Sequence, residues 1–159
     1  MLKSKYLLPA KFKKFGWLLL LPSSVSGVMY MFDAFNPEIL DFNVFAITFD
    51  GFADNRELFG FIGNNIVDEI LALCIISSGL IVAFSKENDE DELISSVRLK
   101  CLVWAMYWNY GLLTVALIFF YEFSFLRFMV INMFTPLILF IVRFNWVMMM
   151  LRKSLKHEE

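Results

Sequence analysis

Residues 101–121 form an apolar stretch without a single Asp, Glu, Lys or Arg, and this stretch constrains the fold more than any other feature. Four consecutive acids precede it at Asp89, Glu90, Asp91 and Glu92, where the unpaired amides of a helix N-terminus would favour negative charge. About 20 apolar residues suffice for a helix to cross the hydrocarbon core of a bilayer. We therefore predict a helix that begins in water, extends over residues 89–100 outside the membrane and then crosses it.

Three further apolar runs have comparable lengths. They cover residues 15–32, 66–84 and 128–151. Hydrophobic residues make up 59% of the 159-residue chain, against about 45–50% in soluble domains, and the 19 Phe exceed what a soluble core of this length could bury. The sequence thus predicts an all-α membrane protein, with residues 1–159 forming a single transmembrane domain built as a four-helix transmembrane bundle.

The first run follows a basic segment, so residues 1–32 also have features of a secretory signal peptide. Apolarity continues to residue 32, which favours a retained helix. The long connection over residues 33–65 is β-prone at 40–49 and has an Asp-Gly turn signal at 50–51. We expect this outer loop to be a short hairpin or an interfacial segment.

The basic residues are distributed asymmetrically. Residues 1–14, 85–100 and 152–159 carry five, three and three Lys or Arg, whereas the two intervening loops carry only Arg56 and Arg127. Basic residues mark cytoplasmic loops. We therefore expect a multi-pass protein with both termini in the cytoplasm.

Polar residues recur inside the predicted spans at similar distances from their cytoplasmic ends. This candidate intramembrane polar layer consists of Ser23, Ser24, Ser77, Ser78, Asn109 and Arg143. The serines are typical of close helix packing, and an asparagine there more often bonds between helices than binds a ligand. On the same helix as Asn109, the spacing of Trp104, Tyr107 and Trp108 favours an interfacial aromatic belt.

Arg143 has two interpretations. It either binds an anion, including an anionic lipid headgroup, or extends to the inner headgroups with its stem on apolar neighbours. The second is favoured, because an arginine this near an interface costs only modestly.

Two charged groups lie outside the spans. A candidate outer cluster consists of Asp68, Glu69, Glu122 and Arg127. It is either an entry site for a cation or proton or, as we favour, a helix cap with an interfacial ion pair. The acids at 89–92 are a candidate cytoplasmic docking site for a basic partner, although a solvated helix start is the commoner meaning of such a run.

Catalytic, metal and cofactor sites are not indicated. The single histidine, His157, lies in a charged tail, and Cys74 and Cys101 fall inside apolar runs. The chain has no phosphate-binding glycine loop, nucleophile elbow or zinc-protease motif. We expect no enzymatic activity, no cofactor and no bound metal.

Four segments carry a resemblance to a known group. They are residues 11–17 (Lys-Phe-Lys-Lys-Phe-Gly-Trp), 82–92, 104–110 and 132–134. Together they resemble small uncharacterised four-helix membrane proteins of Bacteroidetes, over nearly the whole chain. That resemblance implies a bacterial inner-membrane location and a gene that often neighbours a helix-turn-helix regulator. It implies no catalytic residues.

Two functions remain open from the sequence. The first is a non-enzymatic membrane protein that regulates or binds a cytoplasmic protein, and the alternative is a small transporter or channel-like subunit acting as an oligomer. The expected partners are the lipid bilayer, a cytoplasmic regulatory protein and a second copy of the chain, without direct contact to nucleic acid.

Overall fold

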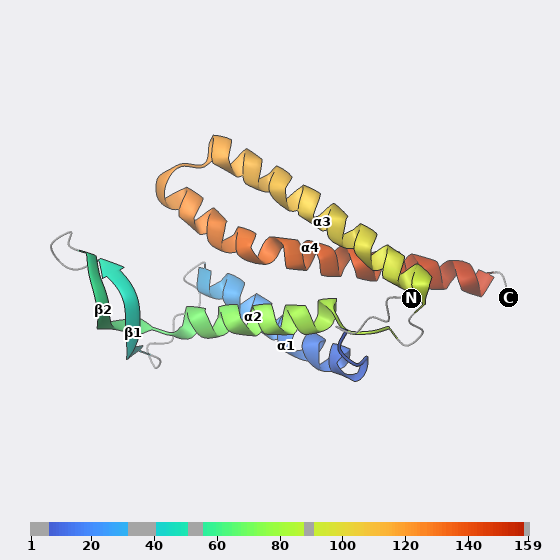
Figure 1. Cartoon of the computed structure of the whole chain (residues 1–159), viewed down its shortest axis with the longest axis horizontal. Coiled ribbons are helices and arrows are strands. Elements are labelled where there is room, and N and C mark those ends of the chain that lie inside the picture. The colour runs from blue at the N-terminus through green and yellow to red at the C-terminus, as the bar shows by residue number, and fades with distance from the viewer. Residues whose placement is uncertain (1–6, 32–40, 51–55, 88–90, 158–159) are drawn as a thin grey trace. The chain divides into compact units, whose positions relative to one another are not determined.

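A computed structural model describes residues 7–31, 41–50, 56–87 and 91–157. Its elements are α1 (Lys11–Met31), β1 (Asp41–Asp50), β2 (Arg56–Asn65), α2 (Val67–Ala83), α3 (Glu92–Phe119) and α4 (Glu122–His157) (Figure 1). The chain divides into two compact units. The first combines Met1–Leu20 with Ile76–Glu159, and the second is Leu21–Ile75. Each unit is described by itself.

Only α3 and α4, among the helices of the described residues, are long and apolar enough to cross a membrane. The prediction of a four-helix transmembrane bundle is therefore wrong, although four helices form near the predicted positions. α2 has 17 residues, which span about 25 Å at 1.5 Å per residue, less than the roughly 30 Å hydrocarbon core. α1 contains three lysines at its start, together with Pro22 and three serines, which lower its apolarity.

α3 begins at Glu92, three residues after the helix start predicted at residue 89. The Oδ1 atom of Asp91 accepts a hydrogen bond from the Glu92 amide at 2.6 Å, so Asp91 is the N-cap. The helix then continues without a break through the uncharged run to Phe119. Its buried residues recur at intervals of three, four and seven: Ile94, Arg98, Cys101, Ala105, Asn109 and Ala116. Most of these are small, which lets α4 approach closely along this stripe.

α4 is antiparallel to α3 and lies beside it (Figure 1). Its 36 residues span about 54 Å, so it is considerably longer than the predicted 128–151 segment. The connection is very short, because α3 ends at Phe119 and α4 begins at Glu122, whose φ of 54° turns the chain. The buried side of α4 consists of Phe140, Ile141, Phe144 and Met148.

α2 also packs on α4 within the first unit. Ser78 is fully buried, and the adjacent Gly79 lies so close to Leu137 that a Cβ atom there would clash with the leucine Cδ2. The Ser77-Ser78-Gly79 segment thus forms a close helix contact, as its small residues predict.

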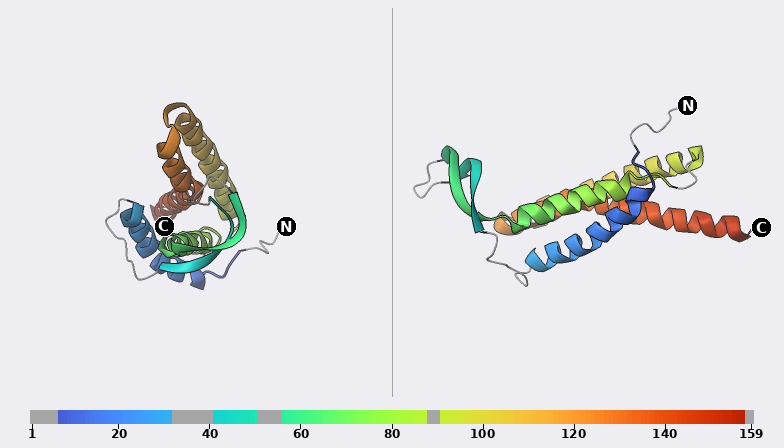
Figure 2. Two further views of the ribbon diagram at one scale, coloured as in Figure 1. Left: turned by 90° about the vertical axis from the view of Figure 1, so that its left-hand side faces the viewer. Right: turned by 90° about the horizontal axis from the view of Figure 1, so that it is seen from below.

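The second unit contains the outer-loop hairpin. β1 and β2 pair antiparallel from Asp41–Asn65 to Asp50–Arg56, and they run side by side in Figure 2. The Phe45 ring lies 5.7 Å from Phe61 and 6.3 Å from Phe59, centroid to centroid. Of the two alternatives for this loop, the hairpin is the one found. Residues 33–40 and 51–55 of the predicted loop lie outside the described residues.

Candidate functional site

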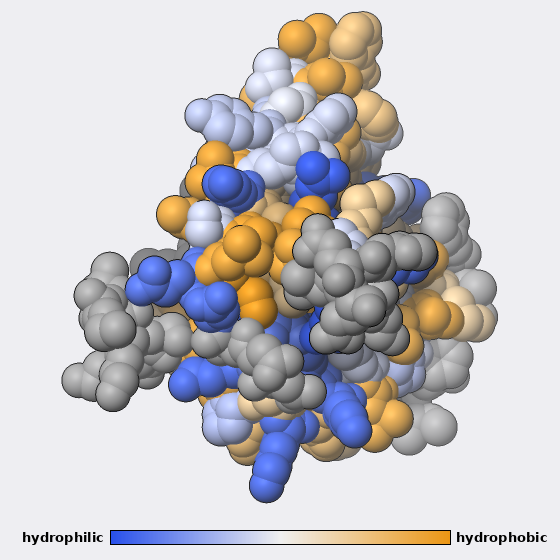
Figure 3. Space-filling view, turned by 90° about the vertical axis from the view of Figure 1, so that its right-hand side faces the viewer, coloured by the Kyte–Doolittle hydropathy of each residue, from blue (hydrophilic) through white to orange (hydrophobic). Residues whose placement is uncertain are grey.

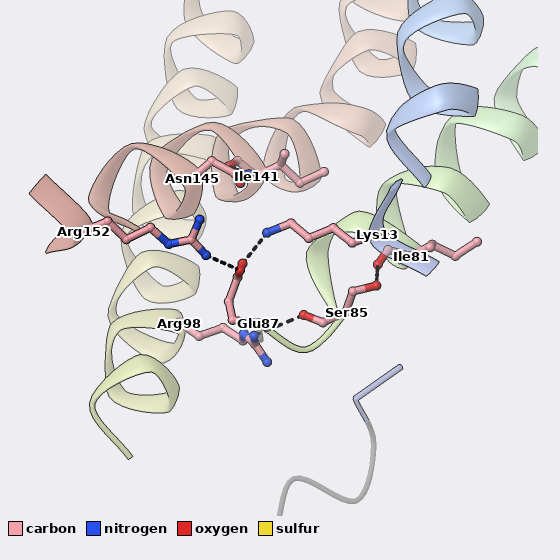
Figure 4. A network of polar contacts seen from close by, with 8 residues as sticks. All are labelled: Lys13, Ile81, Ser85, Glu87, Arg98, Ile141, Asn145 and Arg152. Carbon is pink, nitrogen blue, oxygen red and sulfur yellow. Dashed lines mark hydrogen bonds and ion pairs between the residues drawn. The ribbon is translucent and has the colours of Figure 1, made fainter. Parts of the chain in front are cut away.

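Glu87 is a buried carboxylate of the first unit, in the link between α2 and α3. It is only 8% exposed, and its two carboxylate oxygens accept bonds from two different helices (Figure 4). Oε1 pairs with Nζ of Lys13 on α1, and Oε2 lies 3.0 Å from Nη2 of Arg152 on α4. Together with Arg98, these residues form what we call the Glu87 cluster (Lys13, Glu87, Arg98 and Arg152).

Backbone bonds position the link that carries Glu87. The segment before α1 forms a parallel β-bridge with this link. In this bridge the Leu8 amide donates to the Phe84 carbonyl at 2.9 Å. The Lys86 amide in turn donates to the Leu8 carbonyl at 2.8 Å. The Ser85 hydroxyl donates back to the Ile81 carbonyl. The carboxylate of Glu87 is therefore held on a fixed segment rather than on a free loop.

Arg98 fastens the same link to α3. It is 8% exposed, and its Nη2 donates to the Ser85 carbonyl at 3.2 Å. Its guanidinium carbon lies 5.1 Å from the centroid of the Phe144 ring, and Nζ of Lys13 lies 5.8 Å from the same ring. A cation over an aromatic face is stabilised by the ring quadrupole, so Phe144 supports two of the cluster's three cations.

The cluster holds three cations and one carboxylate, so it leaves a surplus of positive charge at this end of the unit. Figure 3 shows the face on the right-hand side of Figure 1, where α4 ends. Hydrophilic and hydrophobic side chains are mixed on this face. Among the described residues, no group of three or more His, Cys, Asp or Glu could hold a metal ion. The arrangement suits a structural role, in which Glu87 joins α1 to α4 beside a basic surface.

Comparison with protein-family models, with curated proteins and with solved structures gives no match.

The residues of the predicted polar layer divide between the units. Ser23 is buried and Ser24 half-buried in the second unit. In the first unit Ser78 and Asn109 are buried, whereas Ser77 and Arg143 are exposed.

Arg143 lies beside α3, near the charged start of that helix. Its guanidinium carbon is 5.0 Å from the centroid of the Trp104 ring, and the adjacent Phe144 contacts Arg98. Trp104 precedes Asn109 by five residues, so Arg143 contacts α3 nearer its start than the predicted level of Asn109. The aromatic residue that Arg143 meets is the first of the predicted belt.

The predicted outer cluster also divides between the units, with Asp68 and Glu69 in the second and Glu122 and Arg127 in the first. In the second unit, Asn64 Nδ2 donates to Glu69 Oε1 at 2.7 Å. A hydrogen bond with Asp68, followed by partial burial, raises the pKa of Glu69 above its usual range. Asn65 caps α2, because its Oδ1 accepts from the Val67 amide at 3.1 Å.

Of the predicted docking acids, Asp91 and Glu92 are exposed at the start of α3, whereas Asp89 and Glu90 lie outside the described residues. Sequence reasoning missed the Glu87 cluster itself. A signal was present, because Arg98 falls on the same helical stripe as Ile94, Cys101 and Ala105. A charge at an otherwise apolar interface position requires a partner, and Glu87 is the nearest acid outside the consecutive run.

Proposed function

We propose that the chain is a non-enzymatic membrane protein of the bacterial inner membrane that binds a cytoplasmic regulatory protein. α3 and α4 would cross the bilayer as a hairpin. Their surfaces support this, since only 17% and 11% of the residues in their apolar windows are buried. In water, apolar surface of that extent would be an aggregation hazard, whereas in lipid it costs nothing.

The Glu87 cluster supports the sidedness of the proposal. Lys13 near the start of α1 and Arg152 near the end of α4 meet at the same carboxylate, so both belong to one end of the first unit. That end carries most of the basic residues, and the opposite α3–α4 connection carries only Arg127. The basic end therefore belongs in the cytoplasm, together with the C-terminus and the start of α1.

The observation that carries a docking role is the exposed side of the first nine residues of α3, which precede its uncharged run. Leu93 and Leu99 are 52% and 63% exposed there, and Asp91 and Glu92 are exposed at the helix start. Exposed apolar side chains on a helix that begins with two acids fit a partner that presents basic and apolar side chains. The resemblance to proteins encoded beside a helix-turn-helix regulator motivates the choice of a regulatory partner.

Site-specific photo-crosslinking in cells tests this proposal. A photoreactive residue at Leu99 should give a discrete crosslinked protein band, and Asp91→Lys with Glu92→Lys should abolish it. The control position is Leu117, which is 58% exposed but lies within the uncharged run, and it should crosslink to no cytoplasmic protein. A band that is unaffected by both charge reversals would contradict the proposed surface.

A transporter or channel-like subunit acting as an oligomer is the second candidate. Two amide oxygens favour it, because Oδ1 of Asn109 and Oδ1 of Asn132 have no hydrogen-bond partner among the described residues. They lie at comparable distances from the α3–α4 turn, and a second copy could supply donors for them. Solute flux through proteoliposomes that Asn109→Leu abolishes would establish this candidate, and the absence of flux would eliminate it.

A further inference from the structure

Arg143 presents donors that the described residues do not use. The side chain is exposed, and its guanidinium lies over the Trp104 ring at 5.0 Å, with no hydrogen bond or ion pair to the described part of the chain. A guanidinium keeps its five N–H donors in its own plane, in a fork that matches carboxylate and phosphate oxygens. The indole therefore supports one face of the cation and leaves its edge available to an anion.

One face of α3 continues from this point into the uncharged run. Lys100, Trp104, Trp108, Gly111 and Val115 follow one another at intervals of four, four, three and four residues, which places them on one side of a helix. The rings of Trp104 and Trp108 lie 5.8 Å apart. The face thus carries a lysine at one end, then two adjacent indoles, and then a glycine and a valine.

A groove lies on the same face beyond the second indole. It is an open groove of about 360 Å³, lined by Tyr107, Trp108, Gly111, Leu112 and Val115. The space beside Gly111 is open, because a Cβ atom added there would meet no atom within 4 Å. From Trp104 to Val115 the helix rises about 16 Å, which matches most of the length of a fatty acyl chain.

We propose that this face binds one anionic phospholipid, with its phosphate on Arg143 and an acyl chain in the groove at Gly111. The inference rests on the proposed function, because it requires α3 and α4 to lie in a bilayer. A cationic end continuous with an apolar groove is complementary to an amphiphile. A free anion would use only the cationic end, and a purely apolar partner would leave the Arg143 donors without acceptors.

Quenching of tryptophan fluorescence by brominated lipids tests the site in the full chain. Trp17→Phe with Trp146→Phe leaves Trp104 and Trp108 as the only tryptophans, and they are excited selectively over tyrosine. The protein is reconstituted into phosphatidylcholine vesicles with a small fraction of acyl-brominated phosphatidylglycerol or of acyl-brominated phosphatidylcholine. We expect the anionic lipid to quench at about a tenfold lower fraction, because a charge-assisted phosphate contact corresponds to roughly that ratio.

Three variants in the same background test the phosphate contact and the acyl-chain contact separately. Arg143→Gln should remove the preference for the anionic lipid, and Arg143→Lys should weaken it, because lysine lacks the planar fork. Gly111→Leu should fill the groove and reduce quenching by both lipids. The matched control is Arg127→Gln, which removes an exposed arginine from the other end of α4 and should leave the preference unchanged.

The outcomes separate this inference from the proposed function. If neither brominated lipid quenches the fluorescence, α3 is outside the bilayer and the proposed function fails. If both lipids quench equally and Arg143→Gln changes nothing, the protein is in the membrane but the lipid site is wrong. If excess inorganic phosphate abolishes the preference while Gly111→Leu has no effect, the ligand is a free anion, which also overturns the lipid site.

Discussion

Oε2 of Glu87 lies 3.0 Å from Nη2 of Arg152, although 65 residues separate the two in sequence. The same carboxylate pairs with Lys13 through its other oxygen. One buried side chain thus joins the start of α1, the link before α3 and the end of α4. α3 and α4 expose most of their apolar surface. The contacts of Glu87, and of the Phe144 ring with Lys13 and Arg98, are therefore important for packing at this end of the unit.

Neutralising Glu87 should therefore destabilise the first unit. Glu87→Gln removes the charge that compensates Lys13 and Arg152, and we expect a loss of about 1–3 kcal/mol in the free energy of unfolding. Denaturant unfolding in detergent measures it. Lys13→Gln should cost more than Arg152→Gln, because the Lys13 side chain is 19% exposed and that of Arg152 is 61% exposed. Equal stability of Glu87→Gln and the unmodified protein would contradict this structural role of Glu87.

Phe144 should be the most sensitive aromatic residue of α4. It is 2% exposed, stacks on Phe140 at 5.8 Å and supports both Arg98 and Lys13. Phe144→Ala should cost about 3–5 kcal/mol of unfolding free energy. Phe123→Ala is the control, because Phe123 is 80% exposed and its truncation should cost less than about 1 kcal/mol. Comparable losses at the two positions would mean that the packing of Phe144 is incorrect.

Two glycines should respond to alanine in opposite directions. At Gly79 a new Cβ would clash with Cδ2 of Leu137 and lie 3.1 Å from its Cγ, so Gly79→Ala should destabilise by roughly 1–3 kcal/mol. At Gly111 the space is open, and the higher helix propensity of alanine should stabilise by up to about 1 kcal/mol. Thermal unfolding of the two variants in one detergent makes the comparison. A reversed order would contradict the contact between α2 and α4.

Two neighbours of Glu69 should shift its pKa in opposite directions. Asp68 raises the pKa of Glu69 and Asn64 lowers it, so Asp68→Asn should lower that pKa and Asn64→Ala should raise it. A raised carboxyl pKa means that the folded state binds this proton more tightly, so its contribution favours folding at low pH. That contribution is lost as the pH rises through the folded-state pKa. Carboxyl carbon NMR of labelled glutamate follows the midpoint, and an unchanged midpoint in both variants would refute the coupling.

Much of the helical structure was predictable because its determinants are local. The run of acids at 89–92, the uncharged run at 101–121 and the small residues Ser77 and Ser78 each favour a helix or a helix contact without reference to distant residues. Phe and Val in β1, with an Asp-Gly pair at its end, likewise made the hairpin one of the two structures predicted for this loop.

The number of spans and the Glu87 cluster were not predictable in the same way. Apolar composition alone counted α2 as a span, although its 17 helical residues are too few for the hydrocarbon core. The pairing of Glu87 with Lys13 and Arg152 depends on how far α4 extends beyond α3, and no local pattern encodes that length.

Cysteine accessibility across α3 and α4 tests the central claim most directly. In a background of Cys74→Ser and Cys101→Ala, the exposed positions Phe123, Val115 and Ser154 are changed singly to cysteine and treated with a membrane-impermeant maleimide. The account predicts that Phe123→Cys reacts in intact spheroplasts, that Ser154→Cys reacts only after the membrane is broken, and that Val115→Cys reacts only in detergent. Reaction of Val115→Cys at the rate of Phe123→Cys without detergent would contradict a membrane hairpin, and reaction of Ser154→Cys in intact spheroplasts would contradict a cytoplasmic Glu87 cluster.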